Sequence, residues 1–256
     1  MLRIIDARTG DPADAAPVRR GLTRVETRVS GYDSSSLRVL LVADLLVRAL
    51  ELGGTPVWAL LRAERQPAEL RAGAAALGIR PFEEAGESGL GAELAPGAGS
   101  GQAPGLGLGE AQVLHVAAAD EAPAPGGALL AVAPVSPAGP PAGTDPSVLR
   151  LALLSTRRNV PVRLDAATLE EAHDTLARWR GAVAGWARQP SRPIPEEVRT
   201  RLRSAWEDDL DVPGVLRVLR RVEADPDLPE GARFETFAYT DRLLGLELVR
   251  DVGATA

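Results

Sequence analysis

RVSGYDSSSLRVLLVADLLVRALELGG, residues 28–54, predicts the end of a strand, a short turn and a long helix. Residues 25–31 have the character of a buried strand, and residues 37–52 carry leucines and valines at helical spacing. We expect this helix to present one apolar and one charged face, and to end at Gly53 and Gly54. A strand that turns directly into a helix is typical of a βα unit, whose helix N-terminus can hold a phosphate group.

The turn of this unit contains three consecutive serines, Ser34, Ser35 and Ser36. Serine hydroxyls do not ionise at neutral pH, so they are poorly suited to acid–base chemistry. Two interpretations remain open. The hydroxyls and backbone N–H groups bind a phosphate, or one serine only caps the helix. We favour capping, because it explains the residue types without a ligand.

Composition excludes several kinds of chemistry. All 29 cationic side chains are arginines, so a lysine nucleophile, a Schiff base and an ammonium clamp for phosphate are absent from this sequence. The sequence also has no cysteine, which excludes thiol catalysis, disulfides and cysteine-ligated zinc. A formal net charge of −6 gives no general attraction to nucleic acid or anionic lipid.

The sequence shows no segment suited to a membrane or to secretion. The first residues, MLRIIDARTGDPAD, lack the apolar centre of a signal peptide. No stretch approaches the roughly 20 apolar residues that a membrane-spanning helix needs. We therefore expect a cytoplasmic protein with no membrane partner.

The first half alternates short apolar strands with helical patterns, which predicts an α/β fold with a Rossmann-like parallel sheet. Segments 86–109 and 134–143 are rich in Gly, Ala and Pro, and we expect both to be loops. GLGLGE, residues 105–110, resembles a phosphate loop, but it precedes a strand and lacks lysine, so we interpret it as a connector. The expected strands are 2–6, 25–31, 55–63, 112–117 and 128–135, with a further helix over 67–76.

From Asp145 the pattern changes to long helical periodicity without strand alternation. Five segments, beginning near residues 145, 165, 195, 212 and 234, open with residues suited to starting a helix. We therefore expect an all-α helical bundle to follow the sheet. The predicted domains are residues 1–144, Rossmann-like, and residues 145–256, the bundle.

Several stretches together resemble cysteinyl-tRNA synthetases and their mycothiol-ligase relatives. They are VSGYD (29–33), RVLLVADLLVRALELGG (38–54), residues 145–172 and SAWEDDLDVPGVLRVL (204–219). These class I enzymes have a Rossmann-like catalytic domain followed by a helical bundle. The resemblance is good at both ends of the chain and poor between about residues 64 and 127.

The resemblance fails at the positions that carry the family's chemistry. Ser30 stands where the family has a zinc-binding cysteine, and AAADEAPAP (117–125) stands near the expected His-His-Glu-Asn-Glu run. A serine hydroxyl is too weakly acidic to replace a thiolate, so no zinc is expected.

Both signature motifs of the family are also missing. SSSL (34–37) replaces the His-Ile-Gly-His-type motif in a loop about six residues shorter. PVSPAGPPAG (134–143) replaces the Lys-Met-Ser-Lys-Ser loop, and no cation follows before Arg150. Losing one preorganised transition-state donor commonly costs about 10² to 10³ in rate, so adenylation by the family mechanism is not expected.

The sequence therefore predicts a truncated, degenerate and catalytically silent paralogue that acts by binding, as a partner, regulatory or ligand-sensing protein. We expect a protein partner or a second copy, and no tRNA binding, since the net charge is negative and an anticodon-reading domain is missing. The alternative is an enzyme of altered chemistry that binds ATP, another nucleotide or an aminoacyl-adenylate-like ligand. In either case the candidate pocket residues are Ser30, Tyr32, Asp33, Ser34, Ser35 and Ser36.

Other chemistry-bearing residues are interpreted as structural. His115 lies in an apolar strand pattern and His173 in a charged helix, and neither has a second histidine at ligand spacing. The acidic run at residues 207–211 is interpreted as solvated or paired with arginine. Arg157, Arg158 and Arg163 are interpreted as part of the general arginine richness and not as a nucleic-acid contact.

Overall fold

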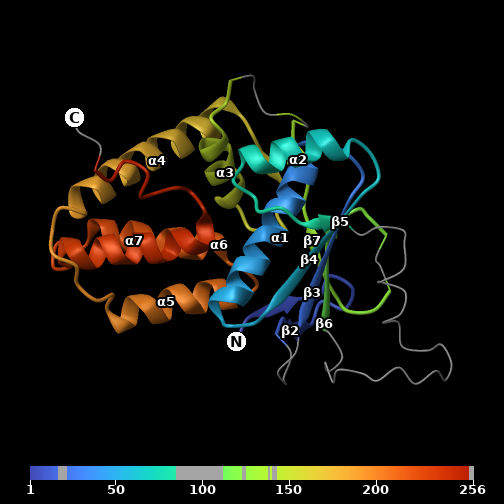
Figure 1. The fold of residues 1–256 in the computed structure, drawn as a ribbon, viewed down its shortest axis with the longest axis horizontal. Helices are drawn as coiled ribbons and strands as arrows, with labels where there is room; N and C mark the ends of the chain where they lie inside the picture. Colours follow the sequence, from blue (N-terminus) through green and yellow to red (C-terminus); the bar gives the residue numbers. More distant parts are fainter. Residues whose placement is uncertain (17–21, 85–111, 123–124, 138, 140–142, 254–256) are drawn as a thin grey trace.

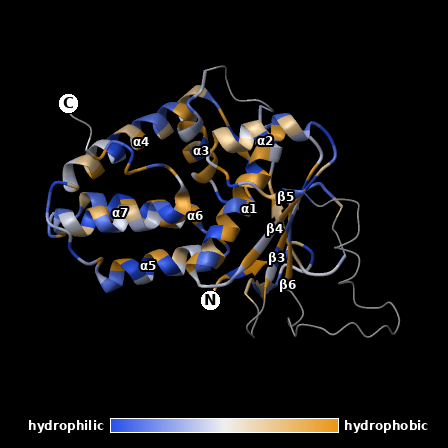
Figure 2. Ribbon diagram, in the orientation of Figure 1, coloured by the Kyte–Doolittle hydropathy of each residue, from blue (hydrophilic) through white to orange (hydrophobic). Residues whose placement is uncertain are grey.

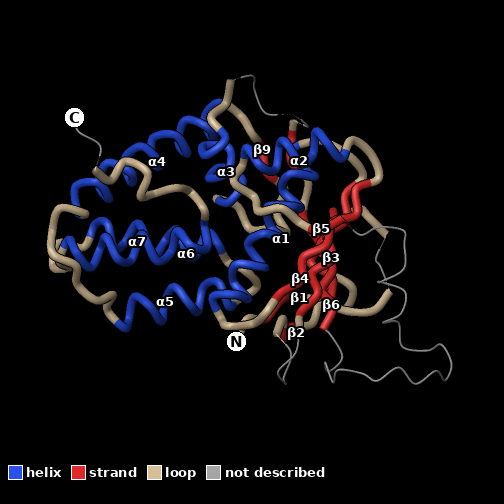
Figure 3. The backbone as a smooth tube through the Cα atoms, viewed as in Figure 1, coloured by secondary structure: helices blue, strands red, loops and turns tan. Residues whose placement is uncertain are grey.

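The computed structural model describes residues 1–16, 22–84, 112–122, 125–137, 139 and 143–253. Figure 3 shows the strands gathered at one end of the molecule and most of the helices at the other. In chain order the elements are β1 (Arg3–Ile5), β2 (Pro12–Asp14), β3 (Thr23–Val29), α1 (Ser34–Leu52), β4 (Val57–Ala63), α2 (Pro67–Ala76), β5 (Glu83–Glu84), β6 (Gln112–Ala118), β7 (Ala128–Val132), β8 (Val135–Ser136), α3 (Pro146–Leu154), β9 (Val162–Arg163), α4 (Ala166–Trp186), α5 (Glu196–Glu207), α6 (Val212–Ala224) and α7 (Glu230–Leu244).

The core is a five-stranded parallel sheet in the order β5-β4-β3-β6-β7. The chain moves outward from β3 to β5 and then returns to β6 on the other side of β3, which is the reversal of strand order found in doubly wound folds. The predicted α/β, Rossmann-like class is therefore confirmed. Helices α1 and α2 lie on the same side of this sheet (Figure 1).

Helix α1 differs from its predicted character. It is buried on almost every side, and the charged side chains of Arg38 and Asp44 are each only 1% exposed. The expected charged outer face is wrong because α1 packs against the sheet on one side and against α2 and α7 on others. The helix is central to the molecule, so its charged residues need partners inside the protein.

Asp44 is at the centre of a buried ionic network. Its carboxylate accepts hydrogen bonds from Arg48 at 2.8 Å, Arg80 at 3.0 Å and Arg150 at 3.2 Å. Arg150 also donates to the carbonyl oxygens of Leu77 and Leu244, at 2.8 and 2.7 Å. The network therefore joins α1 to α3 and to the end of α7.

The second half is mainly helical, as predicted, with helices α3 to α7 beginning at or within a few residues of the expected positions. Trp179, Trp186 and Phe237 pack edge to face, with ring centroids 5.2 to 5.5 Å apart for the two pairs that involve Phe237. Figure 2 shows hydrophobic residues concentrated along the sheet and α1, whereas α5 is largely hydrophilic. These aromatic contacts identify the tryptophans of α4 as core residues.

Two expectations about the connections need correction. Val135–Ser136, inside the predicted loop 134–143, forms β8 and pairs in parallel with β9. Strand β9 lies beyond the predicted boundary at residue 145, so the second half is not strictly all-α, and the pairing crosses that boundary. The predicted loop 86–109 and the GLGLGE stretch lie outside the described residues. The two-domain division itself stays a prediction.

The acidic run at residues 207–211 makes hydrogen bonds and ion pairs within the chain. Asp209 accepts from the backbone N–H of Ile5 at 2.8 Å and also pairs with Arg158. Asp211 lies 2.9 Å from Arg157 and caps α6 through the N–H of Gly214. The arginine-paired interpretation is thus confirmed for these two carboxylates.

None of the helices in the described ranges combines the length and the hydropathy that a bilayer crossing requires.

Candidate functional site

The turn between β3 and α1 brings the six predicted pocket residues to the carboxyl end of the central strand. Asp33, and not a serine, caps α1: its carboxylate accepts from the backbone N–H of Ser36 at 2.6 Å. Its backbone is extended, as the cap position requires. The prediction that a serine caps the helix is therefore wrong. Asp33 lies directly before the serines, at the cap position, and its carboxylate accepts from the Ser36 N–H in place of a serine hydroxyl.

The three serines face different surroundings. The Ser35 hydroxyl accepts from the backbone N–H of Val135 at 3.0 Å, which ties the turn to β8. Ser34 is 1% exposed, and its hydroxyl has no hydrogen-bond partner among the described residues. The backbone N–H of Ser36 is already taken by Asp33. The Ser35 hydroxyl is therefore bound to β8, and the Ser34 hydroxyl is enclosed within the protein.

Ser30 and Tyr32 complete the turn on its outer side. The carbonyl oxygen of Ser30 accepts from Arg65 at 3.2 Å, and the N–H of Tyr32 donates to Gln66 at 3.3 Å. The Tyr32 side chain is 42% exposed. Its ring lies against Gly73 of α2, where an added Cβ would come within 2.6 Å of the ring.

Electrostatics at this helix N-terminus oppose an anionic ligand. A helix N-terminus favours negative charge, and here the carboxylate of Asp33 already supplies it. A phosphate placed at the same donors would meet that carboxylate at close range. The predicted binding role of the turn, which stays a prediction, would therefore suit a neutral or cationic group better than a phosphate.

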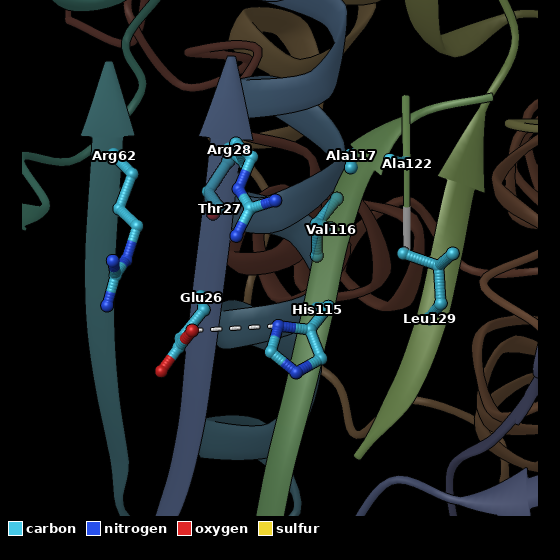
Figure 4. Close-up of a pocket in the computed structure, with 9 residues that line it drawn as sticks. All are labelled: Glu26, Thr27, Arg28, Arg62, His115, Val116, Ala117, Ala122 and Leu129. Atoms are coloured by element: carbon cyan, nitrogen blue, oxygen red, sulfur yellow. Dashed lines mark ion pairs between the residues drawn. The ribbon is translucent and has the colours of Figure 1, made fainter. Parts of the chain in front are cut away.

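A second polar group lies on the face of the sheet away from α1, and sequence reasoning did not identify it. In Figure 4, α1 lies behind the strands, and the side chains of Glu26, Arg28, Arg62 and His115 project from the front. The parallel register places Glu26 of β3 opposite His115 of β6. The His115 Nδ1 lies 3.6 Å from a Glu26 carboxylate oxygen.

His115 is a buried imidazole with one unsatisfied nitrogen. Its side chain is 8% exposed, and Nε2 has no hydrogen-bond partner in the described structure. Burial lowers the pKa of His115 below its usual value, against the opposing effect of Glu26. A neutral imidazole whose Nδ1 faces a carboxylate leaves Nε2 as a proton acceptor. The Glu26 carboxylate is also paired with Arg24 at 2.9 Å, and the cavity beside the imidazole has a volume of only about 10 Å³.

Two arginines stand side by side at the carboxyl ends of β3 and β4. Arg28 and Arg62 are directly opposite in the register, and like charges in that relation are unfavourable. Arg28 lies 3.6 Å from Glu121, whereas Arg62 has no ion pair within the described ranges. They line an open hollow of about 430 Å³ together with Leu61, Ala63, Glu64, Pro67, Arg71 and Glu84. Parallel α/β sheets bind ligands at this end of their strands.

The described residues contain no group of three or more His, Asp or Glu side chains arranged to hold a metal ion.

Part of the chain resembles known ligases. No family model matches it. Over 110 residues it is 37% identical to an L-cysteine:1D-myo-inositol 2-amino-2-deoxy-alpha-D-glucopyranoside ligase of Streptomyces griseus, covering 41% of this chain and 26% of the ligase. Ligases of the same name from Streptosporangium roseum and Parafrankia sp. are 38% identical over 108 residues and 45% identical over 74 residues. The match to the Streptosporangium ligase covers 41% of this chain and 26% of the ligase, and the match to the Parafrankia ligase covers 29% of this chain and 16% of the ligase.

The chain spans about a quarter of the length, or less, of the curated relatives it matches. The similarity supports the predicted relationship to cysteine ligases of the class I synthetase type, over part of the chain. The His115 pair was missed because its partner lies 89 positions away, and only the strand register brings the two together. The alternation of Arg24, Glu26 and Arg28 along β3 was the available signal for a polar sheet face.

Proposed function

We propose that this chain is a non-catalytic relative of the cysteine ligases, and that it acts by binding a protein partner, a second copy of itself or a small ligand. The observation that supports this best is Asp33 at the N-terminus of α1. Its carboxylate accepts from the Ser36 N–H, one of the backbone donors at this helix N-terminus, and its negative charge would repel an ATP phosphate placed there.

The sequence offers no other group that could replace a phosphate-binding helix N-terminus. Without lysine, the charge that develops on a departing pyrophosphate has no ammonium clamp, and without cysteine there is no thiolate to hold zinc. Each missing preorganised donor commonly costs about 10² to 10³ in rate. We propose accordingly that the protein uses neither zinc nor an obligatory nucleotide, that it binds no tRNA, and that it works in the cytoplasm.

The decisive experiment is exchange of labelled pyrophosphate into ATP in the presence of L-cysteine. The chain is purified from the expression host, and a cysteinyl-tRNA synthetase serves as the positive control. We expect exchange at the level of a no-protein blank. Exchange above that blank that disappears when residues 33–36 are replaced by Gly-Ser repeats would overturn the proposal, because it would tie turnover to this turn.

A binding function needs its own positive test. Light scattering after size-exclusion chromatography measures whether the chain forms a dimer or larger species. Thermal-shift screening then compares free amino acids, small carboxylates and phosphate esters, with Arg62→Gln as the matched variant at the 430 Å³ hollow. We expect a stabilising ligand or a stable oligomer. A monomer that responds to no ligand and captures no partner would contradict a binding role.

An enzyme of altered chemistry is the second candidate, and the Glu26–His115 pair is the observation that favours it. Nδ1 faces a carboxylate and Nε2 is unpartnered, which fits a proton acceptor. Stabilisation by ATP or an aminoacyl sulfamoyl adenosine would support this candidate. No stabilisation by any nucleotide would count against it.

A further inference from the structure

Arg38 is a buried cation whose partners are all neutral. Its side chain is 1% exposed, and its terminal nitrogens donate to the carbonyl oxygens of Ala133, Val160 and Arg157 at 2.8 Å and of Thr156 at 3.4 Å. Its remaining donor, Nε–H, has no hydrogen-bond partner in the part of the chain that the structure describes.

The charge of Arg38 is therefore uncompensated. No carboxylate lies within ion-pair distance of it among the described residues, in contrast to Arg150, which meets Asp44 at 3.2 Å. Burial alone lowers the pKa of Arg38 to about 10, so the guanidinium remains protonated at neutral pH. Carbonyl dipoles satisfy its hydrogen bonds, but an isolated buried charge remains costly without an opposite charge.

A second buried arginine lies beside the same space. Arg158 is 7% exposed, and its terminal nitrogens bind the carbonyl oxygens of Ala131 and Ile5 and the carboxylate of Asp209. Its Nε–H is also buried without a partner in the described structure. Arg38, Arg158 and Asp209 together carry one net positive charge, and Asp211, between the lining residues Leu210 and Val212, is paired with Arg157 and Arg217.

Arg38 and Arg158 both line one cavity of about 20 Å³ between α1, α3 and the start of α6. A cavity of roughly 10–15 Å³ already holds a single water-sized particle, so this one fits a monatomic ligand and excludes a nucleotide or an amino acid. Apart from the two arginines and the partly exposed Thr156, the lining is aliphatic: Leu41, Val42, Leu45, Leu153, Leu154, Leu210 and Val212.

We propose that this cavity binds one small monovalent anion of the chloride type, between the Nε–H groups of Arg38 and Arg158. An anion needs only donors, and both unpartnered groups are donors on cations. Among the lining side chains other than the two arginines, only that of Thr156 is polar. A single negative charge balances the net charge of the region, whereas water leaves it unbalanced.

The anion site is independent of the proposed function and concerns the stability of the fold. Arg38 follows the 30–36 turn, and its carbonyl partners belong to the end of β7 and to the segment between α3 and β9. An anion that neutralises Arg38 would strengthen this junction. We expect the folded state to bind chloride and the unfolded chain to lack the site.

The first test compares urea unfolding in sodium chloride and in sodium gluconate at equal ionic strength. Gluconate is too large for the cavity and controls for screening. At twenty times the dissociation constant, chloride should multiply the folding equilibrium constant by about 20, and the effect should saturate. Identical curves in the two salts would overturn the proposal.

The second test locates the ion. Crystals grown or soaked with sodium bromide should show an anomalous scattering peak within the cavity, close to Nε of both arginines. Density that is unchanged between bromide and gluconate would identify a water molecule and would overturn the proposal.

Variants separate the site from general stability. Arg38→Met removes the cation but also four hydrogen bonds, so it risks misfolding. Val42→Ile is the sharper variant, because it keeps both arginines and adds a methylene into the cavity wall. Val47→Ile, on the same buried helix but outside the lining, is its control. Chloride dependence should be lost in Val42→Ile and kept in Val47→Ile, and equal dependence in both would refute the assignment.

Discussion

Asp44 is the residue whose substitution tests the buried ionic network most directly. Asp44 and Arg150 have side chains that are each 1% exposed, so water screens their interaction little. Asp44→Asn preserves the volume of the side chain and removes its charge. Arg150 would then keep its two carbonyl partners but lose its anion.

The expected cost follows from that burial. Breaking a buried ion pair by removing one partner costs about 3–5 kcal/mol, because the remaining charge is left in a medium that solvates it poorly. Typical domains are stable by about 5–15 kcal/mol, so a large share of the stability would be lost. For a chain of this size each 1 kcal/mol lowers Tm by about 2–4 °C, which gives a fall of roughly 6–20 °C.

The assay is urea unfolding followed by tryptophan fluorescence, since Trp179 is fully buried in α4. Arg80→Gln is the control: Arg80 also binds Asp44, but its side chain is 40% exposed, so its loss should cost less than about 1 kcal/mol. The double variant Asp44→Asn/Arg150→Met should cost less than the sum of the single variants. If Asp44→Asn unfolds at the same urea concentration as Arg80→Gln, the network does not stabilise the fold as described.

Three further outcomes are expected. Ser35→Ala should destabilise the chain by about 1–2 kcal/mol, because it leaves the Val135 N–H unsatisfied. Ser34→Ala should be neutral or stabilising, because it removes a buried hydroxyl that has no partner in the described structure. Equal urea midpoints for the two variants would contradict this. Asp33→Ala should cost about 0.5–2 kcal/mol through loss of the helix cap, and no change in the midpoint would rule out that cap. Burial lowers the pKa of His115 below the 6.5 of the unfolded chain, so the unfolded chain binds the proton first as the pH falls. The free energy of unfolding should therefore decrease as the pH drops through 6.5. His115→Gln should flatten this decrease between pH 7.5 and 5.5, and an unchanged slope would refute the burial effect.

The candidate turn was predictable in position but not in its contacts. Its place at the end of a strand and before a helix follows from local sequence, because alternation and helical spacing are properties of neighbouring residues. The Asp33 cap was a local choice between adjacent cap-forming residues, and sequence preference does not rank Asp above Ser strongly enough to decide it. The bond between Ser35 and Val135 spans 100 positions and depends on where β8 lies.

By itself, the sequence determined the order of the longer strands and of the helices, the parallel α/β class and the absence of lysine and cysteine chemistry, but it did not predict the short strands β2, β5, β8 and β9. These follow from composition and from periodicities within single elements. Tertiary structure alone decided that α1 is buried on nearly all sides, that Asp44 meets Arg150, and that His115 faces Glu26. Burial and long-range ion pairs depend on which elements pack together, and a residue's local sequence carries no record of its distant neighbours.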